Sequence, residues 1–154
     1  MKVYKLEYSQ FVNKSINEVF DFFSKPENLS LITPSKLDFN IITPCPIEMK
    51  DGQLIDYTIK IMAKKIRWRT MITQYNPPKM FIDQQLLGPY SMWHHKHIFI
   101  EKNGGVEVID RIHYSIPFGL LGQLVNYLFI NRDLNNIFEY RKKIINQQFE
   151  NKEN

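Results

Sequence analysis

Two histidines separated by one residue, His95 and His97, form the pair in the chain that most strongly suggests chemistry. In an extended strand this spacing places both imidazoles on the same face. Two such imidazoles can hold zinc if a carboxylate such as Asp83 or Asp110 supplies a third ligand. Because the chain has neither a cysteine pair nor an HExxH helix, the pattern is weak support for a metal site. We therefore expect no metal and no cofactor.

The same side chains suggest general acid–base chemistry. His97 acting as a base, oriented by Asp110 and assisted by a hydrogen bond from Tyr114, would suit a cyclase or dehydratase that acts on a polyketide-like or aromatic carbonyl compound. These three residues are the candidate catalytic set, for a lyase or isomerase. A second interpretation stays open, since buried polar side chains often satisfy one another and stabilise a fold without any ligand.

Nucleophilic catalysis has less support in the sequence. Ser91 and Ser115 occupy no nucleophile elbow. The single cysteine, Cys45, lies between two prolines, and we expect it to be an inert free thiol. One cysteine forms no internal disulfide, which favours a cytoplasmic location.

The periodicity of the chain predicts the elements that carry these residues. Residues 3–12 combine β-branched, aromatic and polar side chains and predict a first strand. Ser15 and Glu18 form a capping-box pattern that starts a helix, and this helix must end before Pro26. A second short helix follows and ends at Pro34.

Six further segments have a period of two and are separated by short turn sequences, which predicts an antiparallel meander. They are residues 37–43, 53–62, 65–75, 80–87, 91–101 and 106–116. After Pro117 the period returns to 3.6 for roughly 28 residues. The apolar face of that segment includes Phe138 and also Arg141.

So long a helix is stable only when its apolar face packs on a large partner, and the sheet is the partner available. The order β-α-α-β6-α therefore predicts an α+β helix-grip fold, in which a curved, seven-stranded antiparallel sheet surrounds a long C-terminal helix. We expect a single domain over residues 1–150 and a disordered tail over 151–154.

Strand parity predicts which side chains face this helix. The inward set is mainly aromatic and β-branched, but it includes several polar groups that need hydrogen bonds from one another, from water or from a ligand. The residues that we assign to a ligand-facing interior are Tyr57, Trp68, Phe81, Asp83, Gln85, Trp93, His95, His97, Phe99, Asp110 and Tyr114.

Three blocks carry a family resemblance: FIDQQLLGPYSMWHHKHIF at 81–99, DRIHYSIPFGLLG at 110–122 and IFEYR at 137–141. In these blocks and in its order of elements the chain resembles the SRPBCC superfamily, which includes the birch pollen allergen, START lipid-transfer domains and polyketide cyclases. It is most similar to uncharacterised bacterial ligand-binding members of this size. The resemblance implies a hydrophobic cavity between sheet and helix, with a mouth near Leu121, Leu124 and Leu128. It implies no reaction, because the superfamily mixes carriers, sensors, cyclases and hydroxylation domains.

The charge distribution limits which classes of macromolecule the protein is expected to bind. A net charge of +4 is too small and too dispersed to predict nucleic-acid binding. The hairpin 60–69 is basic and could meet an acidic surface, but parity turns its Trp68 inward, unlike the exposed aromatic residues of RNA-binding proteins. No apolar run reaches the length of a membrane span, so we expect no stable membrane insertion.

These observations favour a cytoplasmic protein that binds a small, mostly hydrophobic molecule, as a carrier or a sensor. One alternative is a cyclase- or dehydratase-type enzyme that uses the same cavity. The other is a protein or membrane interaction module that uses the basic hairpin 60–69. The sequence makes no prediction of the oligomeric state.

Overall fold

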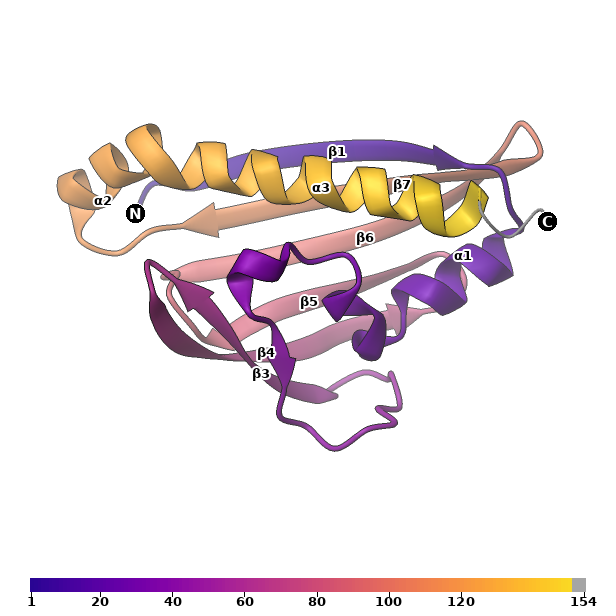
Figure 1. Ribbon diagram of the computed structural model, residues 1–154, viewed down its shortest axis with the longest axis horizontal. Coiled ribbons are helices and arrows are strands. Elements are labelled where there is room, and N and C mark those ends of the chain that lie inside the picture. Colours follow the sequence, from indigo (N-terminus) through magenta and orange to yellow (C-terminus); the bar gives the residue numbers. More distant parts are fainter. Residues whose placement is uncertain (151–154) are drawn as a thin grey trace.

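The elements of the protein follow the predicted order in a computed structural model, which describes residues 1–150 (Figure 1). Strand β1 (Tyr4–Val12) leads into helix α1 (Ile16–Phe23) and two short 3-10 helices, η1 (Pro26–Ser30) and η2 (Ser35–Leu37). The remaining strands are β2 (Asn40–Ile41), β3 (Leu54–Ile61), β4 (Lys64–Asn76), β5 (Met80–Leu87), β6 (Met92–Lys102) and β7 (Gly105–Ser115). The tail predicted at 151–154 lies outside the described residues.

The C-terminal helical segment has three parts. Helix α2 (Gly119–Val125) passes through a π-helical turn, η3 (Asn126–Ile130), into α3 (Asn131–Glu150). The predicted long helix is therefore present, and a change of helical pitch lies near its first third. Among residues 1–150, no helix is both long and apolar enough to cross a membrane.

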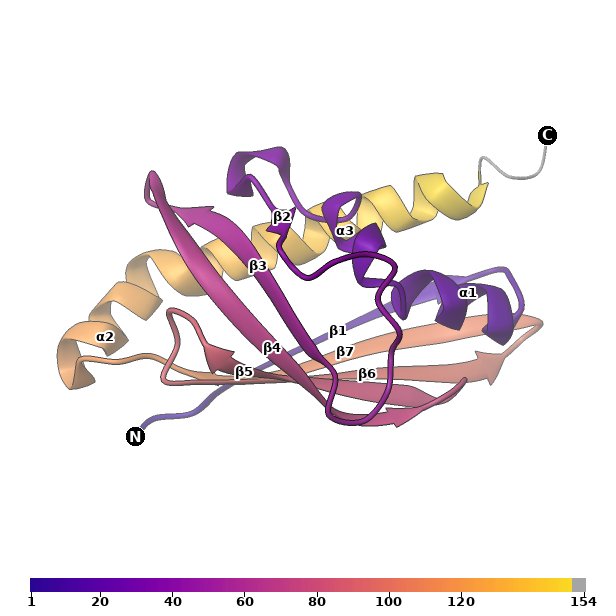
Figure 2. The ribbon, with the colours of Figure 1, turned by 90° about the horizontal axis from the view of Figure 1, so that it is seen from below.

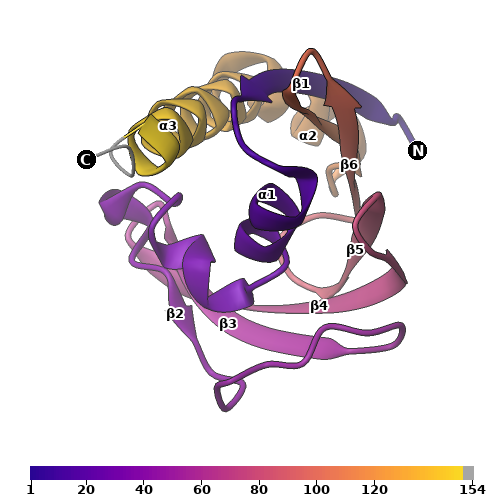
Figure 3. The same cartoon turned by 90° about the vertical axis from the view of Figure 1, so that its right-hand side faces the viewer.

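All seven strands belong to one antiparallel sheet in the order β1-β7-β6-β5-β4-β3-β2. The sheet curves strongly, and α1 and α3 lie on its concave side (Figure 3). This is the predicted α+β helix-grip arrangement. It gives the concave face two helical neighbours and leaves the convex face to polar side chains.

Local sequence explains the entry into this fold, with one correction. At the start of α1, the Ser15 hydroxyl accepts a hydrogen bond from the Glu18 backbone N–H and the Glu18 carboxylate accepts one from the Ser15 N–H, which confirms the capping box. The strand predicted over 37–43 is only two residues long. The reason is that η2 occupies the residues up to Leu37 and Asp38 has a left-handed backbone (φ 43°), so the chain joins the sheet only at Asn40.

The predicted parity is confirmed where it matters for the site. In β6, Trp93, His95, His97 and Phe99 are buried and alternate with more exposed residues. The strand register pairs His95 with Asp83 on β5 and His97 with Asp110 on β7. Three neighbouring strands therefore bring four ionisable side chains onto one inner face.

Candidate functional site

Asp83, His95, His97 and Asp110 form a compact group, which we call the His–Asp cluster. His95 Nε2 lies 2.8 Å from Asp110 Oδ1, and His97 Nε2 lies 2.7 Å from Asp83 Oδ2. The remaining ring nitrogens lie close to the opposite carboxylates, with His97 Nδ1 3.0 Å from Asp110 Oδ1 and His95 Nδ1 3.6 Å from Asp83 Oδ2. The contact of His97 Nδ1 has a favourable distance without the direction of a hydrogen bond. Each imidazole thus lies between both carboxylates.

The cluster lies between two apolar parts of the core. The His97 ring stacks on Phe81 at 4.2 Å between centroids, and the His95 ring lies 5.8 Å from that of Phe138. The two imidazole centroids are themselves 3.7 Å apart. Both histidines are only 5% exposed, so little water screens the charges of the cluster.

The protonation of the cluster follows from this burial and from the pairing. Burial lowers the pKa of His95, and the neighbouring His97 lowers it further. Burial also opposes a charge on His97, but the carboxylates of Asp110 and Asp83 outweigh it and raise the pKa of His97. Against their own burial, the imidazoles hold the pKa of both carboxyl groups below the usual range. The first proton taken up by the histidine pair therefore goes to His97.

This arrangement limits the chemistry that the histidines can perform. A general base must offer a lone pair to its substrate. His97 donates through Nε2 to Asp83 and turns Nδ1 toward Asp110, so it presents no lone pair to the cavity. The geometry does not support His97 as the base of a cyclase.

A metal ion is a further possibility that the donor set allows. Asp83, His95 and His97 each offer one ligand atom, and these atoms lie within 4.8 Å of one another. Asp110, behind the rings, could orient both imidazoles as carboxylates do beside metal-bound histidines. However, the positive charge of Arg141 is near enough to lower the pKa of Asp83, and it opposes a cation at this position.

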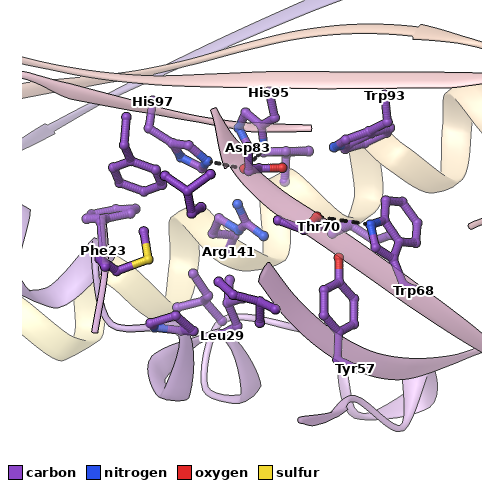
Figure 4. Close-up of a pocket in the computed structure, with 18 of the residues that line it drawn as sticks. Phe23, Leu29, Tyr57, Trp68, Thr70, Asp83, Trp93, His95, His97 and Arg141 are labelled. Atoms are coloured by element: carbon purple, nitrogen blue, oxygen red, sulfur yellow. Dashed lines mark hydrogen bonds and ion pairs between the residues drawn. The ribbon is translucent and has the colours of Figure 1, made fainter. Parts of the chain in front are cut away.

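Next to the cluster lies a mostly apolar cavity of about 150 Å³ between the sheet, α3 and the η1 segment (Figure 4). Its wall comes from every layer of the fold. The lining residues are Phe23, Pro26, Leu29, Ile32, Met49, Ile55, Tyr57, Trp68, Thr70, Ile72, Phe81, Asp83, Trp93, His95, His97, Leu134, Ile137, Phe138 and Arg141. The cluster therefore forms one polar side of an apolar container.

Arg141 is the cation of this cavity. It projects from α3 toward the centre of the lining side chains, and its guanidinium carbon lies 4.8 Å from the centre of the Phe138 ring (Figure 4). Its buried Nε has no hydrogen-bond partner, and no carboxylate of residues 1–150 forms an ion pair with it. A buried N–H donor without an acceptor is costly, so an acceptor supplied from outside would be bound favourably.

A second polar group lies across the cavity. The Trp68 indole N–H donates to the Thr70 hydroxyl at 3.2 Å, and the Tyr57 phenol lies nearby in the cavity wall (Figure 4). Burial raises the pKa of Tyr57 well above its usual range, and Thr70 opposes this only in part. Tyr57 is therefore a neutral hydrogen-bonding group at physiological pH.

The structure brings most of the predicted interior together. Seven of the predicted ligand-facing residues line the cavity: Tyr57, Trp68, Phe81, Asp83, Trp93, His95 and His97. Asp110 is buried behind the two imidazoles and borders a different depression beside β1.

Three other interior residues do not line the cavity, which corrects the prediction for them. The Gln85 amide bonds the backbone of Tyr90 at 2.7 Å, so the β5–β6 turn occupies this side chain. Phe99 packs on Phe20 and Phe23 near α1, at 5.1 and 5.5 Å between ring centroids. Parity placed both residues on the correct face, but their distance along the strand puts them beyond the cavity.

Tyr114, the third of these residues, and the leucines of the C-terminal segment also lie elsewhere. The Tyr114 hydroxyl donates to Asn126 Oδ1 at 2.9 Å, so it anchors η3 and does not assist His97. Leu121, Leu124 and Leu128 are exposed and are not part of the cavity wall. The predicted cavity mouth is misplaced because α2 continues beyond the end of the sheet (Figure 1).

Sequence reasoning missed Arg141 as a site residue, although a signal was present. Arg141 occupies the same helical face as Phe138 and Ile145, both of which are buried. A cation within an apolar stripe indicates either a buried partner or a ligand. Thr70 and Ile72 lie on the inward face of β4, as the alternation of that strand indicates. They line the cavity, although the sequence analysis did not assign them to it.

The basic hairpin of β3 and β4 is partly neutralised by its own strands. Arg69 makes two hydrogen bonds to the Asp56 carboxylate, at 2.8 and 2.9 Å, and Arg67 lies 3.2 Å from the same group. These arginines hold the pKa of Asp56 below its usual range. This pairing favours the interpretation of the hairpin as a solvated outer face.

Comparison with known proteins supports the fold alone. No family model and no curated protein matches the sequence. Among solved structures, TTHA0849 from Thermus thermophilus aligns with a TM-score of 0.76 at 12% identity, over 97% of this chain and 99% of that chain. The di-domain ARO/CYC StfQ from the steffimycin biosynthetic pathway aligns with a TM-score of 0.74 at 14% identity, over 97% of this chain and 52% of that chain.

Ara h 8.0201 aligns with a TM-score of 0.59 at 11% identity, over 94% of this chain and 98% of that chain. These matches confirm the predicted resemblance to the SRPBCC superfamily at the level of fold. Sequence identities this low carry no activity from one protein to another.

Proposed function

Given a helix-grip fold whose cavity contains an unpaired cation, we propose that the protein binds one small, mostly apolar molecule that carries an acidic group. The apolar part lies against Trp68, Trp93 and Phe138, and the acidic group meets Arg141. This is the arrangement common to small-molecule sites, where an apolar wall supplies affinity and a few polar groups set orientation.

The state of Arg141 is the observation that carries this proposal. Its Nε is buried without an acceptor beside an apolar wall. A carboxylate or phenolate would accept from the guanidinium in a charge-assisted hydrogen bond, which is stronger than a bond between neutral groups. Asp83 does not fill this role, because no hydrogen bond or ion pair among residues 1–150 joins it to Arg141, and its Oδ2 pairs with His97.

The cavity volume narrows the ligand class. A cavity of about 150 Å³ has room for a molecule of the size of benzene. A single aromatic ring with a short acidic arm therefore fits without rearrangement, whereas a fused polyketide ring system requires the wall to move. For this reason, and because His97 offers no lone pair, the cyclase or dehydratase alternative has less support.

The two tryptophans of the chain allow a direct binding test, since both line the cavity. Phenylacetate and its neutral analogue phenylacetamide are titrated while intrinsic fluorescence is recorded. We expect the acid to bind more tightly than the amide to the unmodified protein. In Arg141→Gln the affinity for the acid falls about tenfold or more, because a charge-assisted hydrogen bond in a shielded site is lost.

Arg132→Gln is the matched control, since it removes an exposed arginine from the same helix. It leaves both affinities unchanged. Circular dichroism confirms that each variant is folded. The proposal is refuted if neither compound binds, if acid and amide bind equally to the unmodified protein, or if Arg141→Gln retains the preference for the acid.

A further inference from the structure

We propose that residues 117–130, which we call the apolar end, dock the protein onto an anionic lipid surface. This goes beyond ligand binding, because it depends on residues that do not line the cavity. Phe118, Leu120 and Tyr127 are 81%, 83% and 82% exposed. The other large exposed apolar side chains of this segment are Leu121, Leu124, Val125, Leu128 and Phe129.

The segment has no face suited to water. From 112 to 131 the chain contains no Asp, Glu, Lys or Arg. A helix that is apolar around its circumference is normally buried in protein or in lipid. An exposed apolar patch of this kind marks an interaction site.

The helix is nevertheless held firmly on the domain. Gly122 is buried, and a Cβ atom there would lie 3.2 Å from the Ile116 side chain, which follows β7, and would clash with the carbonyl of Pro117. Asn126 is buried and accepts the hydrogen bond of the Tyr114 hydroxyl. The apolar end is therefore a fixed part of the surface, so its exposure does not result from fraying.

The apolar end is too short to cross a bilayer, and its length suits a position at the membrane interface. Even if all of residues 117–130 were helical, they would extend over only about 21 Å, less than the roughly 30 Å hydrocarbon core of a bilayer. A helix of this kind lies at the boundary between head groups and acyl chains.

Cations lie at the same end of the molecule as the apolar end, which is why we commit to an anionic surface. Lys2 and Lys5 share a surface groove with Gln123 and Tyr127. The N-terminus and the β3–β4 turn lie at the same end of the long axis as α2 (Figures 1 and 2). At that turn Met62 is 91% exposed and precedes two exposed lysines, Lys64 and Lys65, of which Lys65 lies 3.8 Å from the Asp38 carboxylate. Apolar insertion combined with basic residues is the pairing of signals that gives stable membrane binding.

A second copy of the chain is a poorer occupant. A two-fold interface places the same surface of both subunits together. The lysines beside the apolar end would then face one another, and like charges at an interface are unfavourable. A lipid surface with negative head groups satisfies both the apolar residues and the lysines.

The test is flotation of the full chain with two kinds of vesicle, one of phosphatidylcholine alone and one that also contains phosphatidylglycerol. We expect binding to the anionic vesicles, and weaker binding as the salt concentration rises. Leu120→Ser/Tyr127→Ser reduces the partition coefficient by about tenfold or more, because two inserted side chains lose their apolar contact. Both residues are exposed, so the fold does not depend on them. Ile100→Ser, at an exposed position on β6, is the matched control and leaves binding unchanged.

A second pair of variants tests the charge. Lys2→Gln/Lys5→Gln weakens binding to anionic vesicles, whereas Lys142→Gln/Lys143→Gln, exposed on α3, has a smaller effect. The proposal is overturned if the unmodified protein fails to float with anionic vesicles, or if Leu120→Ser/Tyr127→Ser floats equally well. A second copy of the chain would be the occupant instead if the unmodified protein binds no vesicles and sediments as a dimer. In that case Leu120→Ser/Tyr127→Ser should convert the dimer to a monomer. Phenylacetate binding in the same variants stays intact, which separates this proposal from that for the cavity.

Discussion

Asp110 contacts both imidazoles of the His–Asp cluster, and its replacement by asparagine should destabilise the protein strongly. Asp110→Asn keeps the shape of the side chain and removes its charge. His95 retains a hydrogen-bond acceptor at the amide oxygen, but His97 loses the nearby negative charge that helps to raise its pKa. The cluster thus loses one of its two negative charges, and Asp83 is the carboxylate that remains beside His97.

The size of the effect follows from burial. Removing one partner of a buried ion pair costs about 3–5 kcal/mol. Asp110 is 7% exposed and both histidines are 5% exposed, so this range applies. Because the hydrogen bond to His95 is retained, we expect the free energy of unfolding to fall by about 3 kcal/mol, the lower end of this range. In a chain of this length, such a loss lowers Tm by about 6–12 °C.

Guanidinium unfolding at neutral pH, followed by circular dichroism, measures this loss. The matched control is Glu7→Gln. It breaks the exposed ion pair between Glu7 on β1 and Arg111 on β7, in which Arg111 Nε lies 2.6 Å from Glu7 Oε2. An exposed pair contributes about 0–1 kcal/mol, so the control remains close to the unmodified protein. If Asp110→Asn costs no more than Glu7→Gln, the idea that a shielded charge network stabilises the central strands is wrong.

Two further predictions concern pH and cavity size. The carboxylates raise the pKa of folded His97, so the stability that they supply is complete below the unfolded pKa of about 6.5 and is lost as the pH rises through the folded value. The lowered pKa of His95 acts in the opposite direction near pH about 6.5, so the decline is read between pH about 7 and 8.5. Unfolding titrations over that range should show it, and His97→Gln should lack it; equal slopes would refute the assignment of the proton to His97. Ile72 lines the cavity and is 2% exposed. Its replacement by alanine should lower the free energy of unfolding by about 2–5 kcal/mol, and its replacement by valine by about 0.5–1.5 kcal/mol. The alanine variant should also bind naphthylacetate more tightly than the unmodified protein does, and unchanged fluorescence titrations would show that Ile72 does not limit the ligand size.

Local signals in the chain were sufficient for the architecture. The capping box at Ser15 and Glu18 starts α1, and alternation in β6 turns Trp93, His95 and His97 inward. Both signals act between near neighbours in sequence, where backbone geometry alone sets the period. The order of strands and helices then left few ways to bury the long helix, and the helix-grip fold is the one observed.

The site itself depends on relations that periodicity does not contain. Parity indicates the face of a strand, but the register between strands decides which residues are backbone neighbours: His95 lies opposite Asp83 and His97 opposite Asp110, so that each imidazole reaches both carboxylates. Whether Arg141 reaches this cluster depends on how α3 is placed along the sheet, which is set by packing across the whole core.

The apolar end is a second feature that the periodicity of the sequence does not predict. Leucines with helical spacing resemble core residues in the sequence, and the family resemblance places Leu121 and Leu124 at a cavity mouth. The sheet ends before α2 does, so nothing among residues 1–150 covers these side chains (Figure 1). Amino-acid types and spacing determine which residues avoid water locally. The lengths and positions of elements far apart in the chain determine whether anything is there to cover them.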